Sequence, residues 1–100
     1  MISGDLMDYQ LADKGEVLCS DMGLDIVDDL VECRNQVGFI QNLLQKPEVE
    51  THIIVKNDMT YPKGCFVRRS YTDPYYLVFF NLHISGSRHL AARPLCRNPG

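Results

Sequence analysis

The stretch that decides the fold is residues 75–82, Tyr75-Tyr76-Leu77-Val78-Phe79-Phe80-Asn81-Leu82, the longest apolar run of the chain. Its aromatic and aliphatic residues predict a strand, and alternate side chains of a strand point to opposite faces of the sheet. One face shows Tyr75, Leu77, Phe79 and Asn81, and the other shows Tyr76, Val78, Phe80 and Leu82. Both faces are apolar, and a single helix covers only one. The second face is therefore either covered by the chain's own termini or exposed as an aromatic patch for a partner, and the two can combine.

Two further strands are predicted before this one. Thr51–Lys56 is rich in β-branched residues, and Cys65–Ser70 follows a turn signal at Tyr61–Gly64. Thr72-Asp73-Pro74 is typical of the hairpin connection into the last strand. Residues 83–100 are expected to form a loop because of the breakers that they contain, Gly86, Pro94 and Pro99.

A helix is predicted over residues 25–45. Its apolar residues recur at steps of three and four and form one stripe: Ile26, Leu30, Cys33, Val37, Ile40 and Leu44. Asp25 is a suitable N-cap, and Pro47 prevents the helix from continuing. Gly38 interrupts the helix, which indicates either the close approach of another backbone or a tolerated imperfection.

These elements predict an α+β fold in one domain, residues 1–100, which suits a chain of 100 residues and 11.4 kDa. An acidic arm (1–24) is expected to lie extended over the domain, followed by the helix (25–45), the sheet (51–82) and the C-terminal loop (83–100). One central helix packs on a small antiparallel sheet of about three strands. Two disulfides staple the domain.

Four cysteines at wide spacing, Cys19, Cys33, Cys65 and Cys96, indicate two disulfides and hence an oxidising compartment. Three connectivities are possible. We favour Cys33–Cys65, which would pin the helix to the start of the sheet, and Cys19–Cys96, which would tie the two ends together. The alternatives are buried free thiols and a zinc site, although no Cys-x-x-Cys pair is present. The start of the chain lacks the pattern of a signal peptide, so a presequence is expected to have been removed or to lie outside this sequence.

Charge is divided along the chain, although the formal net charge is only −3. Residues 1–33 carry nine acidic residues against Lys14, and residues 62–100 carry six basic residues against Asp73. The two ends either attract each other within the fold or dock on charged surfaces of a partner. The net acidic charge disfavours a general nucleic-acid binder, and no apolar run is long enough to span a bilayer.

Catalytic patterns are thin. Asn81, His83 and Ser85 are close in sequence, but no Gly-x-Ser-x-Gly elbow surrounds a serine. A polar strand end that caps a loop explains them better than a small hydrolase using His83 or a pigment or metal ligand. Asp28 and Asp29 suit the start of a helix better than acid–base chemistry. The chain is therefore expected not to be an enzyme and to bind no metal, cofactor or small-molecule substrate.

Several motifs together resemble a known family. They are Tyr9-Gln10-Leu11-Ala12-Asp13-Lys14-Gly15 before Cys19, Tyr61-Pro62-Lys63-Gly64-Cys65, Phe79-Phe80-Asn81-Leu82-His83 with Ser85-Gly86-Ser87, and Pro94-Leu95-Cys96. This set resembles the small four-cysteine domains common in proteins of dinoflagellate algae. The chain departs from the family at Phe79-Phe80, where Tyr-Phe is frequent, and at residues 68–74, which replace a Gly-rich turn.

The resemblance implies a disulfide framework and an algal organelle. One setting that it implies is an accessory subunit of a dinoflagellate photosystem I with its light-harvesting antennae, on the lumenal side of the chloroplast thylakoid. We therefore expect a non-catalytic accessory or linker subunit that stabilises a larger membrane-associated complex. The residues expected to contact its other protein subunits are Tyr76, Phe80, Arg68, Arg69 and Arg88. The alternative is a free secreted or lumenal binding module that recognises a carbohydrate or inhibits an enzyme.

Overall fold

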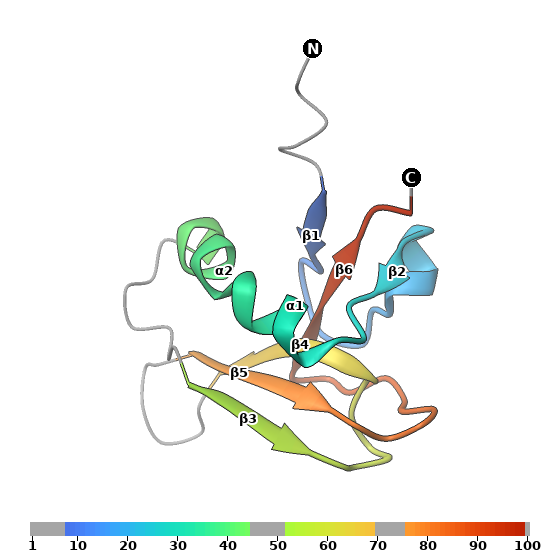
Figure 1. The fold of residues 1–100 in the computed structure, drawn as a ribbon. Coiled ribbons are helices and arrows are strands. Elements are labelled where there is room, and N and C mark those ends of the chain that lie inside the picture. Colours follow the sequence, from blue (N-terminus) through green and yellow to red (C-terminus); the bar gives the residue numbers. More distant parts are fainter. Residues whose placement is uncertain (1–7, 45–51, 70–75, 100) are drawn as a thin grey trace.

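The computed structural model describes residues 8–44, 52–69 and 76–99. In chain order the elements are β1 (Tyr9–Leu11), the 3-10 helix η2 (Cys19–Met22), β2 (Asp25–Ile26), α1 (Leu30–Asn35), α2 (Val37–Leu44), β3 (Ile53–Lys56), β4 (Gly64–Arg69), β5 (Tyr76–Asn81) and β6 (Ala92–Arg97). The six strands form one sheet in the order β1-β6-β4-β5-β3, with β2 also paired to β6. Figure 1 shows α1 and α2 above β4, β5 and β3, whereas β1, β6 and β2 stand upright beside the helices.

The sheet is larger than the predicted three strands, and it is mixed rather than antiparallel. β4 and β5 form the expected antiparallel hairpin, with Gly64 opposite Asn81 and Arg69 opposite Tyr76. β3 runs parallel to β5, and every other strand pair is antiparallel. The three predicted strands are confirmed to within two residues at their described ends. The predicted hairpin turn at 72–74 lies outside the described residues.

The expectation of a C-terminal loop over residues 83–100 is wrong, because Ala92–Arg97 form β6. Pro94 is expected to break a strand, yet it lies inside this one. A proline has no N–H for the ladder, so the carbonyl of Ala12 on the neighbouring chain segment would lack a donor. Arg93 supplies it: its Nε donates to the oxygen of Ala12 at 2.7 Å, while the N–H of Ala12 donates to the oxygen of Pro94 at 3.0 Å.

The expected acidic arm is part of the sheet rather than a cover over it. β1 pairs antiparallel with β6, so that Tyr9 lies opposite Arg97, and β2 pairs with β6 through Asp25 opposite the same arginine. The end of β6 is therefore held between two strands from the first quarter of the chain. Residues 1–7 lie outside the described part of the structure.

The helix starts later than predicted. Asp25 belongs to β2, and Val27 accepts a hydrogen bond at 3.0 Å from the N–H of Cys65, which keeps this segment extended. Asp29 is the N-cap, because its carboxylate accepts from the N–H groups of Val31 and Glu32. Asp25, Asp28 and Asp29 are all suitable N-caps by residue type. The hydrogen bond between Val27 and β4 keeps the chain extended up to this point, so the helix begins after Asp29.

The predicted single helix is two. Gln36 separates α1 from α2, but the predicted apolar stripe is confirmed where it faces the core, since Cys33, Val37 and Ile40 are buried. A Cβ on Gly38 would meet nothing within 4 Å, so this glycine is a tolerated imperfection. The predicted end near Gln45 lies outside the described residues. None of the helices in the described ranges is long and apolar enough to cross a membrane.

Candidate protein-interaction site

Both faces of β5 are covered by the chain itself. On the helix side, Val78 and Phe80 pack in the main core with Cys33 and Ile40. On the other side, Phe79 packs in a second cluster with Tyr61, Phe66 and Ala92. The hypothesis of an exposed aromatic face on this strand is therefore wrong for residues 78–81, which are all buried.

The cover of the second face is a stack of rings. Phe66 stacks on Phe79 with ring centroids 5.0 Å apart, Tyr61 stacks on Phe66 at 5.2 Å, and His89 stacks on Tyr61 at 4.1 Å. Lys56 and Arg68 place their cationic groups over these rings, at 4.1 Å from the centroid of Tyr61 and 5.0 Å from that of Phe79. Two loops that carry little periodic pattern, 57–63 and 82–91, thus supply the side chains that a second helix would otherwise have to provide.

The five residues expected to contact a partner are not brought together. Phe80 is 4% exposed and belongs to the core, so it presents no surface to a partner and its assignment is corrected. Arg88 is paired with Asp21, and Arg68 lies over Phe79. Only Tyr76 and Arg69 lie directly opposite each other, on neighbouring strands. Tyr76 is half-buried and Arg69 is exposed.

Acidic residues of the first third of the chain form ion pairs with basic residues that follow residue 62. Arg88 pairs with Asp21, Arg97 with Glu32 at 2.7 Å, and Lys63 with Asp28 at 3.3 Å. Hydrogen bonds from Arg88 and from the N–H of Leu18 hold the pKa of Asp21 below its usual value. These pairs join the acidic first third of the chain to the basic last third, as the alternative of internal attraction predicts.

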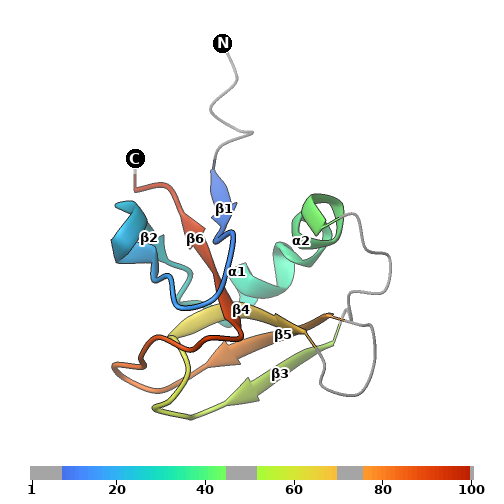
Figure 2. The same cartoon turned by 180° about the vertical axis from the view of Figure 1, so that it is seen from behind.

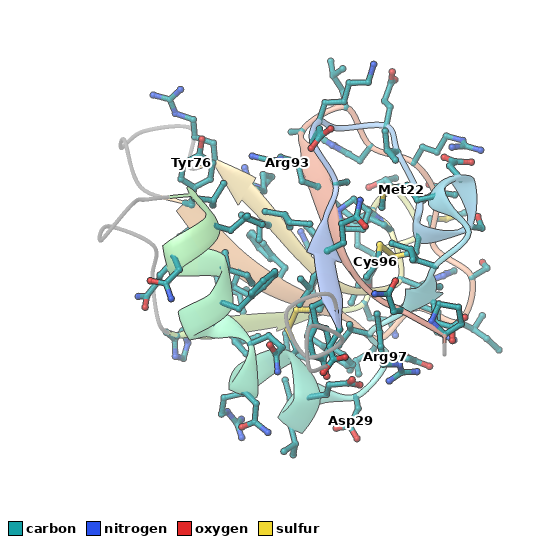
Figure 3. The ribbon with its side chains drawn as sticks, turned by 90° about the horizontal axis from the view of Figure 1, so that it is seen from above. Met22, Asp29, Tyr76, Arg93, Cys96 and Arg97 are labelled. Carbon is teal, nitrogen blue, oxygen red and sulfur yellow. A yellow bond between two sulfur atoms is a disulfide. The ribbon has the colours of Figure 1, made fainter. Side chains whose placement is uncertain are left out.

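A phenol, a carboxylate and a guanidinium join β1, α1 and β6. Tyr9 donates from its hydroxyl to Oε2 of Glu32 at 2.6 Å, and Nη1 of Arg97 donates to both oxygens of the same carboxylate at 2.7 and 2.9 Å. The hydrogen bond to Glu32, followed by burial, raises the pKa of Tyr9 from its ordinary value of 10.0 to about 12. Figure 3 labels Arg97 close to Asp29, at the start of α1.

This raised pKa predicts a loss of stability at high pH. The folded state holds the proton of Tyr9 more tightly than the unfolded chain does, so the contribution is complete below pH 10 and is lost as the pH rises from 10 to about 12. We expect the free energy of unfolding in urea to fall more steeply over this range in the natural chain than in Tyr9→Phe. Parallel profiles for the two proteins would show that the phenol proton makes no contribution.

The two disulfides have the favoured connectivity. Cys19 bonds Cys96, with Cα atoms 5.5 Å apart, and Cys33 bonds Cys65, with Cα atoms 5.6 Å apart. All four cysteines are buried, and none is free. The first bridge fixes η2 to β6, and the second fixes α1 to the start of β4.

Asn81, at the end of β5, is the centre of a buried polar network. Its side chain is 0% exposed. The Nδ2 group lies 2.8, 3.1 and 3.0 Å from the carbonyl oxygens of Asp58, Tyr61 and Pro62, and Oδ1 accepts from the N–H groups of Asp58 and His83. One side chain therefore holds the loop before β4 against the loop after β5.

His83 caps the turn that follows. Its Nδ1 accepts hydrogen bonds from the N–H groups of Ser85 at 3.2 Å and Gly86 at 3.1 Å. Ser85 Oγ lies 3.4 Å from the same nitrogen, which is therefore already engaged by two backbone donors. A nucleophile–base pair needs that nitrogen free to take the serine proton, so the geometry is that of a turn cap.

The cavity beside this turn is small compared with ligand-binding pockets, which measure roughly 300–1,000 Å³. It measures about 60 Å³, room for about two water molecules, and is lined by residues that include Cys19, Lys63, Ser85 and Ser87. His83 is not among its lining residues. Within residues 8–44, 52–69 and 76–99, no group of three His, Cys, Asp or Glu side chains is placed to hold a metal ion.

Four exposed apolar side chains lie on segments that adjoin at one end of the sheet. Val55 lies on β3, an edge strand, and is 47% exposed; Met59, Leu82 and Ile84 follow in the two adjoining loops and are 67%, 57% and 84% exposed. Hydrogen bonds tie these segments together, since the N–H of Leu82 donates to Lys56 and the hydroxyl of Ser87 donates to Met59. We call these four residues, Val55, Met59, Leu82 and Ile84, the β3 patch.

Sequence reasoning missed the β3 patch because three of its members lie in loops, where apolar residues show no period. The available signal was Met59 and Ile84 themselves, large apolar residues flanked by polar ones in segments predicted as turns or loops. Comparison with other proteins adds no assignment for this surface: no family model, no curated protein and no solved structure matches the chain.

Proposed function

We propose that the chain is a non-catalytic subunit that binds other proteins within a larger assembly, and that the β3 patch is its contact surface. The observation that carries this proposal is the exposure of four large apolar side chains on adjoining segments at one end of the sheet. Apolar side chains grouped on a surface favour burial against another protein. Among the strands that the structure describes, β3 is at the edge of the sheet, so the patch also borders backbone groups that can form hydrogen bonds.

The setting that we propose follows from the motifs alone. Their resemblance to four-cysteine domains of dinoflagellate algae favours the lumenal side of the thylakoid, in a photosystem I complex with its antennae. Two disulfides suit a lumenal compartment, because oxidising compartments preserve them.

The test is native purification of the tagged chain, followed by identification and quantification of its companion chains by mass spectrometry. The variant Met59→Ser/Leu82→Ser/Ile84→Ser should lose at least nine-tenths of the companions. The matched control is Val31→Ser/Leu90→Ser, which removes exposed apolar side chains elsewhere and should retain them. Circular dichroism and intact mass confirm that both variants are folded with their disulfides formed.

Two outcomes oppose the proposal. If the natural chain is recovered as a free monomer of 11.4 kDa, the alternative of a free secreted or lumenal binding module takes its place. If the triple variant keeps its companions, the contact surface lies elsewhere. Companions that are not photosystem polypeptides would overturn the proposed setting while leaving the subunit role intact.

A further inference from the structure

A groove lies between β1 and α2, on the opposite side of β1 from β6. Its volume is about 420 Å³, within the range of ligand-binding pockets. Both side views place β1 between β6 and α2 (Figures 1 and 2), and Figure 3 looks down on this side of the molecule. The groove is lined by Tyr9, Gln10, Leu11, Asp13, Phe39, Leu43, Leu44 and Arg93.

Three consecutive residues of β1 line this groove, which shows that it follows the edge of the strand. Alternate side chains of a strand lie on opposite faces, so Gln10 and its two neighbours share a groove only along the strand edge. β1 is the terminal strand of the sheet, so among the described residues no other strand pairs with this edge.

The outer edge of β1 carries backbone groups that can pair with a further strand. Its ladder with β6 uses Asp8, whose carbonyl accepts from Asn98 at 2.9 Å, and Ala12, which donates to Pro94. In an antiparallel pair alternate residues turn their N–H and C=O groups to the same partner. The intervening residues, Tyr9 and Leu11, therefore turn theirs toward the groove. Within the described residues, no backbone hydrogen bond engages these groups. Leu11 is 3% exposed, so the backbone groups open to a ligand are those of Tyr9, which is half-buried.

The opposite wall is an apolar helix face. Phe39, Leu43 and Leu44 of α2 line the groove, and Leu43 is 49% exposed although it belongs to a core-facing helix. An extended segment lying along β1 would direct every second side chain against this wall.

One end of the groove carries positive charge. The Nε of Arg93 donates a hydrogen bond to the carbonyl of Ala12, and its two Nη atoms form no hydrogen bond with any residue in the described ranges. Arg93 lies opposite Val67, and Arg69, two residues further along β4, shares that face of the sheet. Arg93 and Asp13 are the charged residues that line the groove. Arg69 is exposed and adds a second positive charge on the face of the sheet that carries Arg93.

From these features we infer that the groove binds an extended, acidic peptide segment of another protein, which adds to the free edge of β1 as a seventh strand. Its backbone bonds the N–H and C=O groups of Tyr9. Its alternate side chains pack on α2, and one carboxylate lies at Arg93. The groove and the β3 patch share no residue, so this inference does not rest on the subunit role proposed above.

The probe is the peptide acetyl-Glu-Thr-Val-Thr-Glu-amide, which places a carboxylate at the Arg93 end in either strand direction. Added to the full-length, disulfide-bonded chain, it should shift the amide NMR signals of Tyr9, Leu11 and Leu43 and leave those of Met59 and Ile84 unchanged. Replacing both glutamates of the peptide by glutamine should weaken binding about tenfold or more, as expected for loss of charged hydrogen bonds.

Backbone methylation distinguishes strand addition from simple burial. Peptides methylated on alternate amide nitrogens come in two registers, and only the register that faces β1 should lose binding. On the protein, Leu43→Glu should abolish binding, whereas Val31→Glu, a matched change on an exposed residue of α1, should leave it unchanged.

Three results with the peptide would overturn the inference: no amide shift at millimolar peptide, equal binding of both methylated registers, or binding of the glutamine peptide as tight as that of the glutamate peptide. A fourth is the appearance of the same amide shifts when the concentration of the chain alone is raised, because the occupant would then be a second copy of the chain. The triple serine variant of the β3 patch should bind the peptide normally, so the failure of one proposal is distinguishable from that of the other.

Discussion

Removal of the Cys19–Cys96 disulfide, as Cys19→Ala/Cys96→Ala, is expected to lower the free energy of unfolding by about 4.5 kcal/mol. A cross-link restricts the unfolded chain, and the restriction grows with the logarithm of the loop that it closes. The bonded residues are 77 positions apart, which gives this figure in the chain-entropy model. Small domains have a total stability of roughly 5–15 kcal/mol, so the variant should be close to unfolded at 37 °C.

The matched control is the other bridge. Cys33 and Cys65 are 32 positions apart, and the same model gives about 3.7 kcal/mol for Cys33→Ala/Cys65→Ala. Urea unfolding of the natural chain and of both double variants, with disulfide content checked by intact mass, measures the difference. A larger loss at the shorter loop would show that packing around the α1–β4 bridge outweighs loop entropy.

The sequence was sufficient to predict the elements that pack through repeated contacts. β5 and β4 follow from runs of aromatic and β-branched residues, and the buried stripe of the helices follows from apolar steps of three and four. The spacing of the cysteines allows three pairings, and the favoured one, with one bridge between helix and sheet and the other between the chain ends, is confirmed. In each case a local pattern and a long-range contact favour the same structure.

The elements that could not be predicted depend on single long-range contacts. β6 contains Pro94, a sequence signal for a break, and only the side chain of Arg93 compensates the missing N–H. The start of α1 depends on a hydrogen bond from Cys65 to Val27. Neither contact can be predicted from the spacing of residues along the chain.

The prediction of a surplus aromatic face failed for a related reason. One helical layer covers only one face of β5, but loops cover the other. Tyr61 and His89 come from segments without a period, and they close the second face by stacking on Phe66. The exposed apolar surface lies beyond this stack, at the β3 patch.

The residues that carry the family resemblance have structural roles here. Gly64 has φ of 85°, and a Cβ there would lie 2.6 Å from the oxygen of Val27. Gly86, with φ of 62°, would place a Cβ 2.5 Å from the nitrogen of Lys63. His83 caps its turn, and the cysteines form the bridges. Most of these motif residues hold the fold, although Tyr9–Leu11 and Asp13 also line the groove and Leu82 belongs to the β3 patch.

Asn81 is the residue of these motifs whose replacement should cost most. In Asn81→Leu the side chain keeps a similar volume but loses its amide, so the carbonyl of Pro62 and the N–H groups of Asp58 and His83 lose this partner. The carbonyl of Tyr61 still accepts from the N–H of Ser87. A buried polar group left unpaired costs roughly 1–3 kcal/mol, so we expect a loss of about 3–5 kcal/mol in the free energy of unfolding. Urea unfolding measures the loss, and faster amide hydrogen exchange in both loops should accompany it.

The control is Asn42→Leu, at an exposed position of α2, which should change the free energy of unfolding by less than about 0.5 kcal/mol. Asn81→Asp is the sharper comparison, because it keeps Oδ1 for Asp58 and His83 and replaces only the donor. The carboxylate would then face three carbonyl oxygens, so this variant should be at least as unstable as Asn81→Leu. Retention of natural stability in both Asn81 variants would mean that the two loops are held by the ring stack of Tyr61 rather than by the amide.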